Sequence, residues 1–466
     1  MSNNMWLEGK RKYITIFLAW LLLVVSFHGN FFQVGLNKDW FDGFQADSRV
    51  IVENAAVCKG LHKYDGPVYQ KGTDKVALSF FNANMAKEQF CHDKAMVPYD
   101  SQYGAQARVV AAFAPQEKSD IDRYLRKVEL LLSMLSAAVV MMIIVAVYRL
   151  VGLVPTSVMY TLAAVSPWIV GYARNLYWFE WMMLLPFAFA LLAYPWFKGR
   201  GLSRVFYGIE AVLLYVKLLN GYEHVTVVAV SVLVPVVMYE AIKSTAPLWK
   251  YWKQAMIVAG ISVIALGGAI ATHLGTLSQH YGSWDEATAR LRERSSERSV
   301  AGLQRMQPYV ILGTQVTLPD VYAFIDRFTD LEFLKDGNGS PVKYAAISAI
   351  NYLLLPAVTL PISIAGVFGV VLQSVAAFMV YGFLAIRRIK HSKQYKKYYR
   401  SLLYGFWVSV LAWMTWIVLM PGHVYPHAHL NAIIFYLPML FICYMAIGCV
   451  VAEMIKHRKG KSGARK

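Results

Sequence analysis

The sequence is poor in charged residues and in cysteine for its length. Asp, Glu, Lys and Arg make up 16% of its 466 residues, whereas hydrophobic residues make up 57%. This balance excludes an ordinary soluble domain and is typical of a chain that crosses a membrane several times. The 4 cysteines are too few for a disulfide-rich scaffold. We therefore predict an all-α polytopic membrane protein.

The sequence also lacks the short motifs of several large enzyme classes. It contains no GxxxxGKS/T, no GxGxxG after a strand, no HExxH and no GxSxG. Their absence argues against a motor ATPase, a nucleotide oxidoreductase and the common hydrolases. No cleavable signal pattern is evident either, because the long apolar run after residues 1–12 has no small-residue cleavage site. We read this run as a signal anchor.

About ten apolar runs approach the roughly 20 residues that a helix needs to cross a bilayer. A shorter apolar run, residues 344–358, contains Pro356 and predicts a helix at the membrane interface. The expected spans are residues 13–32, 128–150, 154–172, 180–197, 205–219, 225–242, 255–274, 360–386, 402–420 and 432–455.

These runs divide the chain into five parts. Two long polar segments interrupt the spans, and recurring Tyr, Phe and Trp residues indicate that both segments fold. The parts are 1–32 (N-terminus and first span), 33–127 (first outer segment with an acidic motif), 128–274 (spans two to seven), 275–343 (second outer segment) and 344–466 (interfacial helix, last three spans and basic tail).

The net charge of +18 could indicate nucleic-acid binding, but the basic residues cluster in short links between apolar runs. Cytoplasmic links of membrane proteins carry an excess of Lys and Arg. With ten spans, the basic links all fall on one side, and both termini lie in the cytoplasm. These links are residues 9–12, 198–204, 243–253, 387–400 and 456–466.

Two of the cysteines belong to the first outer segment. Cys58 and Cys91 could form a disulfide on an oxidising face, or remain two buried thiols. Cys443 and Cys449 lie in the last span and are expected in the core.

An acidic motif follows the first span. Asp39, Asp42 and Asp47 lie in and beside the sequence FDGFQADSR, at or just outside the expected membrane surface. A carboxylate in such a place can act as a general base. The alternatives are an ordinary solvated loop, or an aspartate that caps a helix beginning at Ser48.

The three short outer loops also carry polar residues. Such groups either reach toward water or pair with one another, or they line one shared functional cavity. The histidines of the third loop could bind zinc, but their loose spacing favours hydrogen bonding to a phosphate or a sugar. The residues concerned are Arg174 and Glu180, Glu223 and His224, and His423, His427 and His429.

An arginine-rich stretch opens the second outer segment. Arg290, Arg294 and Arg298 recur every four residues, so a helix would present them on one face. Arginine binds phosphate in a bidentate manner. The alternative is a solvated helix whose arginines pair with Glu293 and Glu297.

The whole arrangement resembles the GT-C superfamily of integral membrane glycosyltransferases. The likeness rests on one span, an acidic motif opening a large outer segment, and many further spans. Local patterns reinforce it, although Asp39, Asp42 and Asp47 form no strict DxD or DE pair. These patterns are PYDSQYGAQ at 98–106, ARNLYW at 173–178, GYEH at 221–224 and HxxxHxHxN at 423–431.

The resemblance implies a bacterial inner-membrane enzyme that inverts the configuration of a transferred sugar on the outer face. Its donor would be a polyprenyl phosphate-sugar, and its acceptor a hydroxyl of a lipid-linked or periplasmic glycan. Asp47 is the preferred base, before Asp42 and Asp39, and a divalent cation is an open option. The phosphate-binding candidates are Arg294, Arg298, Arg174, His423, His427 and His429, and the sugar-binding candidates are Glu180, Glu223, His224, Tyr103 and Gln102.

The leading alternative is a transporter or a flippase of lipid-linked glycans. Such proteins tend to contain repeated halves and broken helices near the middle of the membrane. This sequence has no clear internal repeat, and its polar residues concentrate at one face. An acyltransferase or a phosphoethanolamine-type transferase would need an intramembrane His/Asp pair or a metal-binding soluble domain, and neither is evident.

Overall fold

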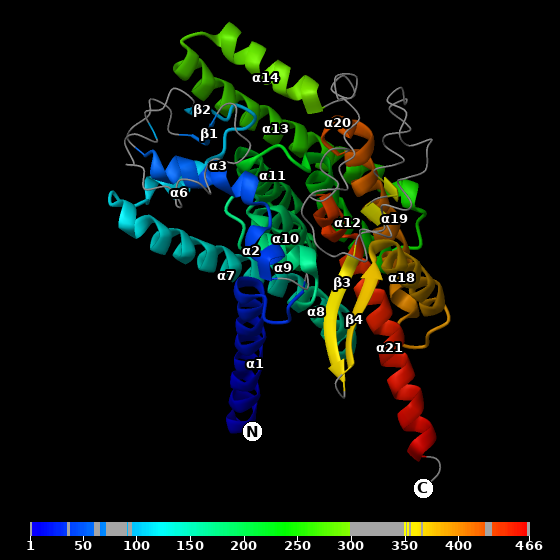
Figure 1. The fold of residues 1–466 in the computed structure, drawn as a ribbon. Coiled ribbons are helices and arrows are strands. Elements are labelled where there is room, and N and C mark those ends of the chain that lie inside the picture. The colour runs from blue at the N-terminus through cyan, green and yellow to red at the C-terminus, as the bar shows by residue number, and fades with distance from the viewer. Residues whose placement is uncertain are drawn as a thin grey trace, which may run out of the picture.

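The computed structural model describes residues 2–34, 38–59, 66–70, 91, 96–298, 349–350, 352–353, 356–364, 367–424 and 431–463. In this part of the chain, six helices are long and apolar enough to cross a membrane. They indicate an α-helical polytopic membrane protein (Figure 1). The six lie within α7 (Lys118–Val151), α10 (Glu180–Gly199), α12 (Val225–Lys243), η1–α13 (Leu248–Tyr251 and Trp252–Tyr281), η3–α19 (Lys396–Tyr398 and Tyr399–Leu419) and α21 (Met439–Gly463).

Three other expected spans are helical, but none of them alone is both long enough and apolar enough to count as a membrane-crossing helix. Helices α8 (Leu153–Ala164) and α9 (Pro167–Ala173) form a pair bent by 64°, which would raise the count to seven if the pair crosses as one span. The apolar part of α1 (Ser2–Gly29) is short, and α11 (Ser203–Asn220) carries charged residues within its apolar run. The described helices therefore do not establish ten spans.

The prediction of one helical span over residues 360–386 was wrong. This stretch begins within an antiparallel hairpin of β3 (Pro356–Ile364) and β4 (Val367–Ser374), and only α18 (Val375–Ile389) is helical. Pro361 disfavours a helix interior, and the many β-branched residues favour strands. Residues 356–358 of the expected interfacial helix belong to β3 for the same reason.

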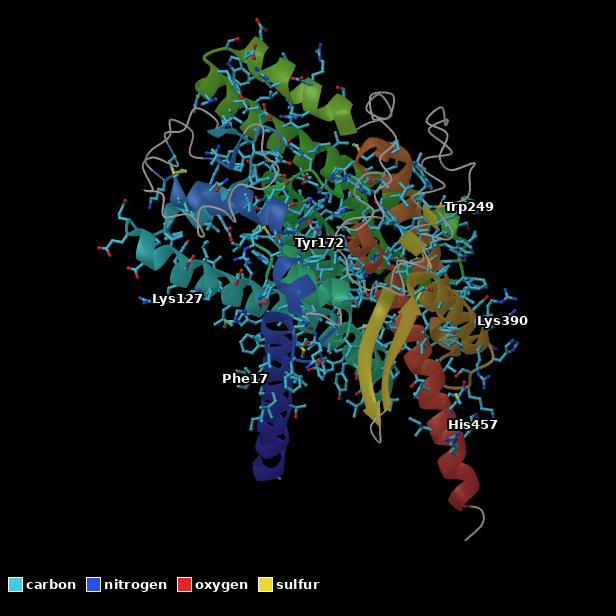
Figure 2. The ribbon with its side chains drawn as sticks, viewed as in Figure 1. Phe17, Lys127, Tyr172, Trp249, Lys390 and His457 are labelled. Atoms are coloured by element: carbon cyan, nitrogen blue, oxygen red, sulfur yellow. A yellow bond between two sulfur atoms is a disulfide. The ribbon has the colours of Figure 1, made fainter. Side chains whose placement is uncertain are left out.

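The basic links gather at one end of the helix bundle, which we call the basic end. Lys198 forms an ion pair with Glu240 at 3.1 Å, and Arg400 donates to the Thr245 carbonyl at 2.7 Å. Figure 2 shows Trp249, Lys390 and His457 along one margin of the molecule. Three links that are far apart in sequence therefore share one end, as the distribution of positive charge predicts.

Apolar side chains remain exposed along the outer helices. On α13, Val263 is 69% exposed and Ile264 is 72% exposed, and Phe17 of α1 is 56% exposed. A water-facing surface rarely carries such continuous apolar rows, whereas a lipid-facing surface does. Trp249 and Trp252, at the basic end, are also exposed and suit a membrane interface.

The segments at the opposite end form a cap over the bundle, which we call the loop end. Cys58 and Cys91 are joined by a disulfide, with their Cα atoms 5.4 Å apart, so the expected pairing is present. Gly282 has a φ of +75°, which suits the turn between α13 and α14. The other elements of this end are α2 (Lys38–Gly43), α3 (Ala46–Val57), β1 (Val68–Gln70), β2 (Met96–Pro98), α6 (Ala105–Ala112), α14 (Trp284–Arg298), α20 (Pro421–Val424) and η4 (Asn431–Tyr436).

Candidate functional site at the loop end

The acidic motif forms two short helices above the end of α1. Asp39 and Asp42 lie in α2, and Asp47 lies in the first turn of α3, where an acidic residue favours the helix dipole. The side chains of Asp39 and Asp47 lie outside the described part. Helix α3 begins at Ala46, with Gln45 as its N-cap, so the alternative of an aspartate capping a helix at Ser48 was wrong.

Arg174 holds the acidic motif in place. Its guanidinium donates to Asp42 at 2.8 Å and to the Phe41 carbonyl at 2.9 Å, and it lies 3.8 Å from the centre of the Phe41 ring. The Arg174 side chain is 15% exposed and that of Asp42 is 49% exposed. The pair therefore presents one carboxylate to solvent while its cation anchors the motif to the end of α9.

A second arginine fixes α3 against α7. Arg49 contacts Glu53 at 2.5 Å and Glu129 at 2.9 Å, and both carboxylates are almost fully buried. The Arg49 guanidinium thus forms ion pairs with two carboxylates. Burial raises the pKa of Glu53, and this effect exceeds the opposing influence of Arg49.

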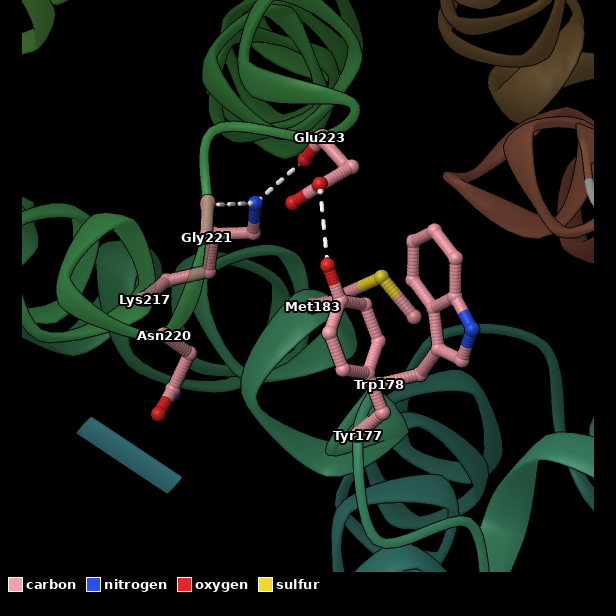
Figure 3. Close-up of a pocket in the computed structure, with 7 residues that line it drawn as sticks. All are labelled: Tyr177, Trp178, Met183, Lys217, Asn220, Gly221 and Glu223. Atoms are coloured by element: carbon pink, nitrogen blue, oxygen red, sulfur yellow. Dashed lines mark hydrogen bonds between the residues drawn. The ribbon is translucent and has the colours of Figure 1, made fainter. Parts of the chain in front are cut away.

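A polar recess lies between α10, α11 and the loop before α12 (Figure 3). The Tyr177 hydroxyl lies 3.4 Å from the Glu223 carboxylate and 3.2 Å from the Gln102 side-chain oxygen. The Lys217 ammonium donates to the carbonyls of Gly221, at 2.8 Å, and of Glu223. Gln102, Lys217 and Glu223 are all at most 5% exposed. The recess is therefore lined by a buried cation and a buried carboxylate, and the buried amide of Gln102 contacts the Tyr177 hydroxyl beside it.

Gly221 is required by this arrangement. A Cβ at this position would collide with the Glu223 carboxylate and with the Gln102 side-chain oxygen. The absence of a side chain is what allows these two polar groups to approach each other over the backbone.

Aromatic and imidazole rings connect the recess to the other loops. Ring centroids are 5.6 Å apart for Trp178 and His224, 5.1 Å for His224 and Trp416, and 5.5 Å for Trp416 and His423. The Trp178 indole also donates to the Gln45 side chain at 3.3 Å, which joins this row to the acidic motif. Residues of all three short loops therefore lie in one connected row of rings; that they line a shared cavity stays a prediction.

The arginine-rich stretch forms α14. Arg294 pairs with buried Asp100 at 3.0 Å, whereas Arg290 pairs with Glu286 of its own helix at 3.0 Å. Arg298 is the last residue of α14, and its side chain lies outside the described part. Asp100 precedes Gln102 by two residues, so Arg294 reaches the loop beside the recess.

Two sugar-binding candidates have different surroundings. Glu180 is fully buried, and its carboxylate has no hydrogen-bond partner among the described residues. The Ser136 hydroxyl lies within its reach but donates to the Ala173 carbonyl at 3.1 Å. Tyr103 packs against Arg108, and the Arg108 guanidinium lies 4.4 Å from the centre of the Tyr103 ring.

A metal site is not evident in the part of the chain that the structure describes. No group of three or more His, Cys, Asp or Glu residues there could hold an ion. His423 is buried against Trp416, while His427 and His429 lie outside the described residues.

Comparisons with known proteins add no identification: no protein family, no curated protein and no solved structure matches the chain.

Sequence reasoning missed several residues of this end. Lys217 could have been noticed, because a charged residue near the end of an apolar run demands a partner. The pairing of Arg49 with Glu129 and of Arg294 with Asp100 joins distant segments, and no local pattern signals either contact.

Proposed function

We propose that the protein is an inverting membrane glycosyltransferase of the GT-C type. It would move a sugar from a polyprenyl phosphate-sugar to a hydroxyl of a lipid-linked or periplasmic glycan, on the extracytoplasmic side of a bacterial inner membrane. One observation carries the proposal: Tyr177, Lys217 and Glu223 line a polar recess that Gln102 contacts through Tyr177 and that Trp178 links to the acidic motif. Ionisable residues buried at such a place in a membrane protein are functional candidates.

The proposed reaction needs a general base, and the acidic motif supplies it. Asp47 is the first candidate and Asp42 the second. The chosen carboxylate takes the proton of the acceptor hydroxyl while the oxygen bonds to the anomeric carbon. The bond between that carbon and the phosphate oxygen breaks with inversion, and the prenyl phosphate leaves with the bonding electron pair. Asp42 offers a half-exposed carboxylate that Arg174 holds at 2.8 Å.

The leaving phosphate gains negative charge as its bond to the sugar breaks. A cation held near it lowers the barrier, because the attraction strengthens as the charge develops. Arg294 and Arg298 of α14 are the candidates for this role. Arg294 and Arg174 are each already paired with one aspartate, Asp100 and Asp42, so a phosphate would share either cation with that carboxylate.

The direct test is an assay of purified protein with a panel of polyprenyl phosphate-sugars and candidate glycans, with and without chelator. Mass spectrometry would report the mass of a hexose or pentose gained by the acceptor. The Asp47→Asn and Asp42→Asn variants identify the base. Asp120→Asn is a matched control, because Asp120 is another ion-paired aspartate with a similarly exposed side chain, at 46%.

A transporter or flippase is the second candidate, and one observation favours it. Glu180 and Glu210 are fully buried within helices, and neither carboxylate has a hydrogen-bond partner among the described residues. Unpaired carboxylates inside a membrane often bind protons or ions along a transport path. Lipid-linked glycan movement in reconstituted vesicles, without any sugar transfer, would favour this alternative.

A further inference from the structure

We infer that the recess lined by Tyr177, Lys217 and Glu223 binds a single uncharged hydroxyl of the donor sugar. The inference rests on the proposed function and adds the part of the substrate that the recess recognises. Four points support it: the size of the recess, its charge balance, its hydrogen-bonding groups and the contact of Arg294 with the adjoining loop.

Size excludes a whole sugar ring. The space inside the recess is about 10 Å³, which suits one water-sized group. A hydroxyl fits this space, whereas a pyranose ring does not. The ring would therefore remain outside, where the exposed rim of the loop end begins.

Charge excludes an ionised substituent. Lys217 and Glu223 both line the recess, so their formal charges cancel. A uronic acid would leave the buried recess with a net negative charge, and an amino sugar with a net positive charge, because Lys217 and Glu223 already balance each other. A net charge in a buried site costs binding energy. A neutral hydroxyl avoids both penalties.

The hydrogen-bonding groups match the two roles of a hydroxyl. Gln102 does not line the recess but contacts it through its side-chain oxygen, which accepts from Tyr177 at 3.2 Å. Lys217 has three N–H groups, and two of them reach the carbonyls of Gly221 and Glu223. The donor within the recess is therefore the remaining N–H group of Lys217. The Glu223 carboxylate can accept the hydroxyl proton. A bound hydroxyl would therefore donate one hydrogen bond to Glu223 and accept one from Lys217.

The position of α14 indicates that the recess recognises the donor sugar rather than the acceptor. Arg294 binds Asp100, two residues before Gln102 in the same loop. A donor phosphate beside Arg294 would carry its sugar toward the recess, because the sugar is bonded directly to that phosphate.

The experiment compares parent and monodeoxy donors in the wild type, in Lys217→Met, which removes the donor of the recess, and in Glu223→Gln. The donors are undecaprenyl phosphate-glucose, -galactose and -mannose, each with its monodeoxy analogues. We expect one deoxygenation to lower wild-type kcat/KM by at least about tenfold, the equivalent of a hydrogen bond to a charged group. In either variant the parent and that deoxy donor should differ by no more than about twofold. Gln394→Met, at the basic end, should behave as the wild type.

Equal sensitivity to deoxygenation in the wild type and in both variants would overturn the recess inference and leave glycosyl transfer standing. Competition binding of the same donors to the purified protein separates the other outcomes. Hydroxyl-selective binding without transfer would support the recess and overturn the proposed reaction. Neither binding nor transfer with any donor would overturn both.

Discussion

At the scale of single residues, the loop end depends on close approach of polar groups. Gly221 allows Glu223 and Gln102 to meet, and Arg49 lies between Glu53 and Glu129. Neither feature leaves a recognisable local pattern. Gly221 stands in a short polar loop where glycine is common, and Arg49 reads as a surface residue beside an acidic motif. Both roles follow from distant parts of the chain.

The Gly221→Ala variant should be less stable and should lose sugar transfer. Its Cβ would displace Glu223 and Gln102, and overpacking of this kind costs about 1–3 kcal/mol. Gly208→Ala on α11 is the control, because nothing lies within 4 Å of its Cβ position. Thermal unfolding in detergent and the transfer assay measure both effects. Equal behaviour of the two variants would contradict the close packing at Gly221.

The stability of the wild type should depend on pH through Glu53. Burial raises the pKa of this carboxyl in the folded protein, so the folded state holds its proton more tightly than the unfolded state does. The stabilising effect of that proton is complete below the unfolded pKa of about 4.5. It is lost as the pH rises from there through the higher folded pKa.

Unfolding of the wild type and of Glu53→Gln between about pH 4 and about pH 7, a range that begins just below the usual pKa of a glutamate side chain, tests this dependence. The glutamine variant should lack that component of the pH profile. Glu117→Gln, at an exposed position before α7, should retain it. Identical profiles for the wild type and Glu53→Gln would contradict the role of Glu53.

At the scale of elements, local hydropathy predicts the apolar helices well. Helices α10 and α12 begin at the first residue of the expected spans, because length and composition are local properties. Hydropathy fails at residues 360–386, since a run of apolar residues does not distinguish a hairpin from a helix. It also places the start of α7 late, because the polar first turns after Lys118 contain no apolar signal.

Helix α14 provides a comparison of two arginines. Arg294 reaches Asp100 of the loop beside the recess, whereas Arg290 pairs with Glu286 of its own helix and lies over the Tyr281 ring. Arg294→Ala should raise KM for the polyprenyl phosphate-sugar several-fold, because both the loop and the donor phosphate would lose a cation. Arg290→Ala should leave KM near the wild-type value. Equal KM values in steady-state assays of the two variants would remove Arg294 from donor binding.

At the scale of the whole molecule, the two ends of the bundle differ in chemistry. Basic links meet at one end, and the acidic motif, the recess and α14 lie at the other. The division of charge was predictable from sequence because it follows the order of the links. The convergence of the three short loops was only an expectation until the ring contacts of Trp178, His224, Trp416 and His423 joined them.

Labelling of single cysteines should place the two ends on opposite sides of the membrane. A membrane-impermeant maleimide should modify Thr288→Cys, on the exposed surface of α14, in intact cells. It should modify Lys393→Cys, in the basic link before α19, only after permeabilisation. Labelling of Lys393→Cys in intact cells would invert the proposed orientation.

The central claim is that this chain transfers sugar from a polyprenyl phosphate carrier with an aspartate of the acidic motif as base. The most direct measurement is mass spectrometry of glycan acceptors incubated with wild type, Asp47→Asn, Asp42→Asn and the Asp120→Asn control. We predict a sugar adduct with the wild type and with Asp120→Asn, and a rate at least about 100-fold lower in one of the motif variants, as loss of a general base requires. An undiminished rate in both motif variants, or no adduct from any donor with correctly folded protein, would contradict the claim.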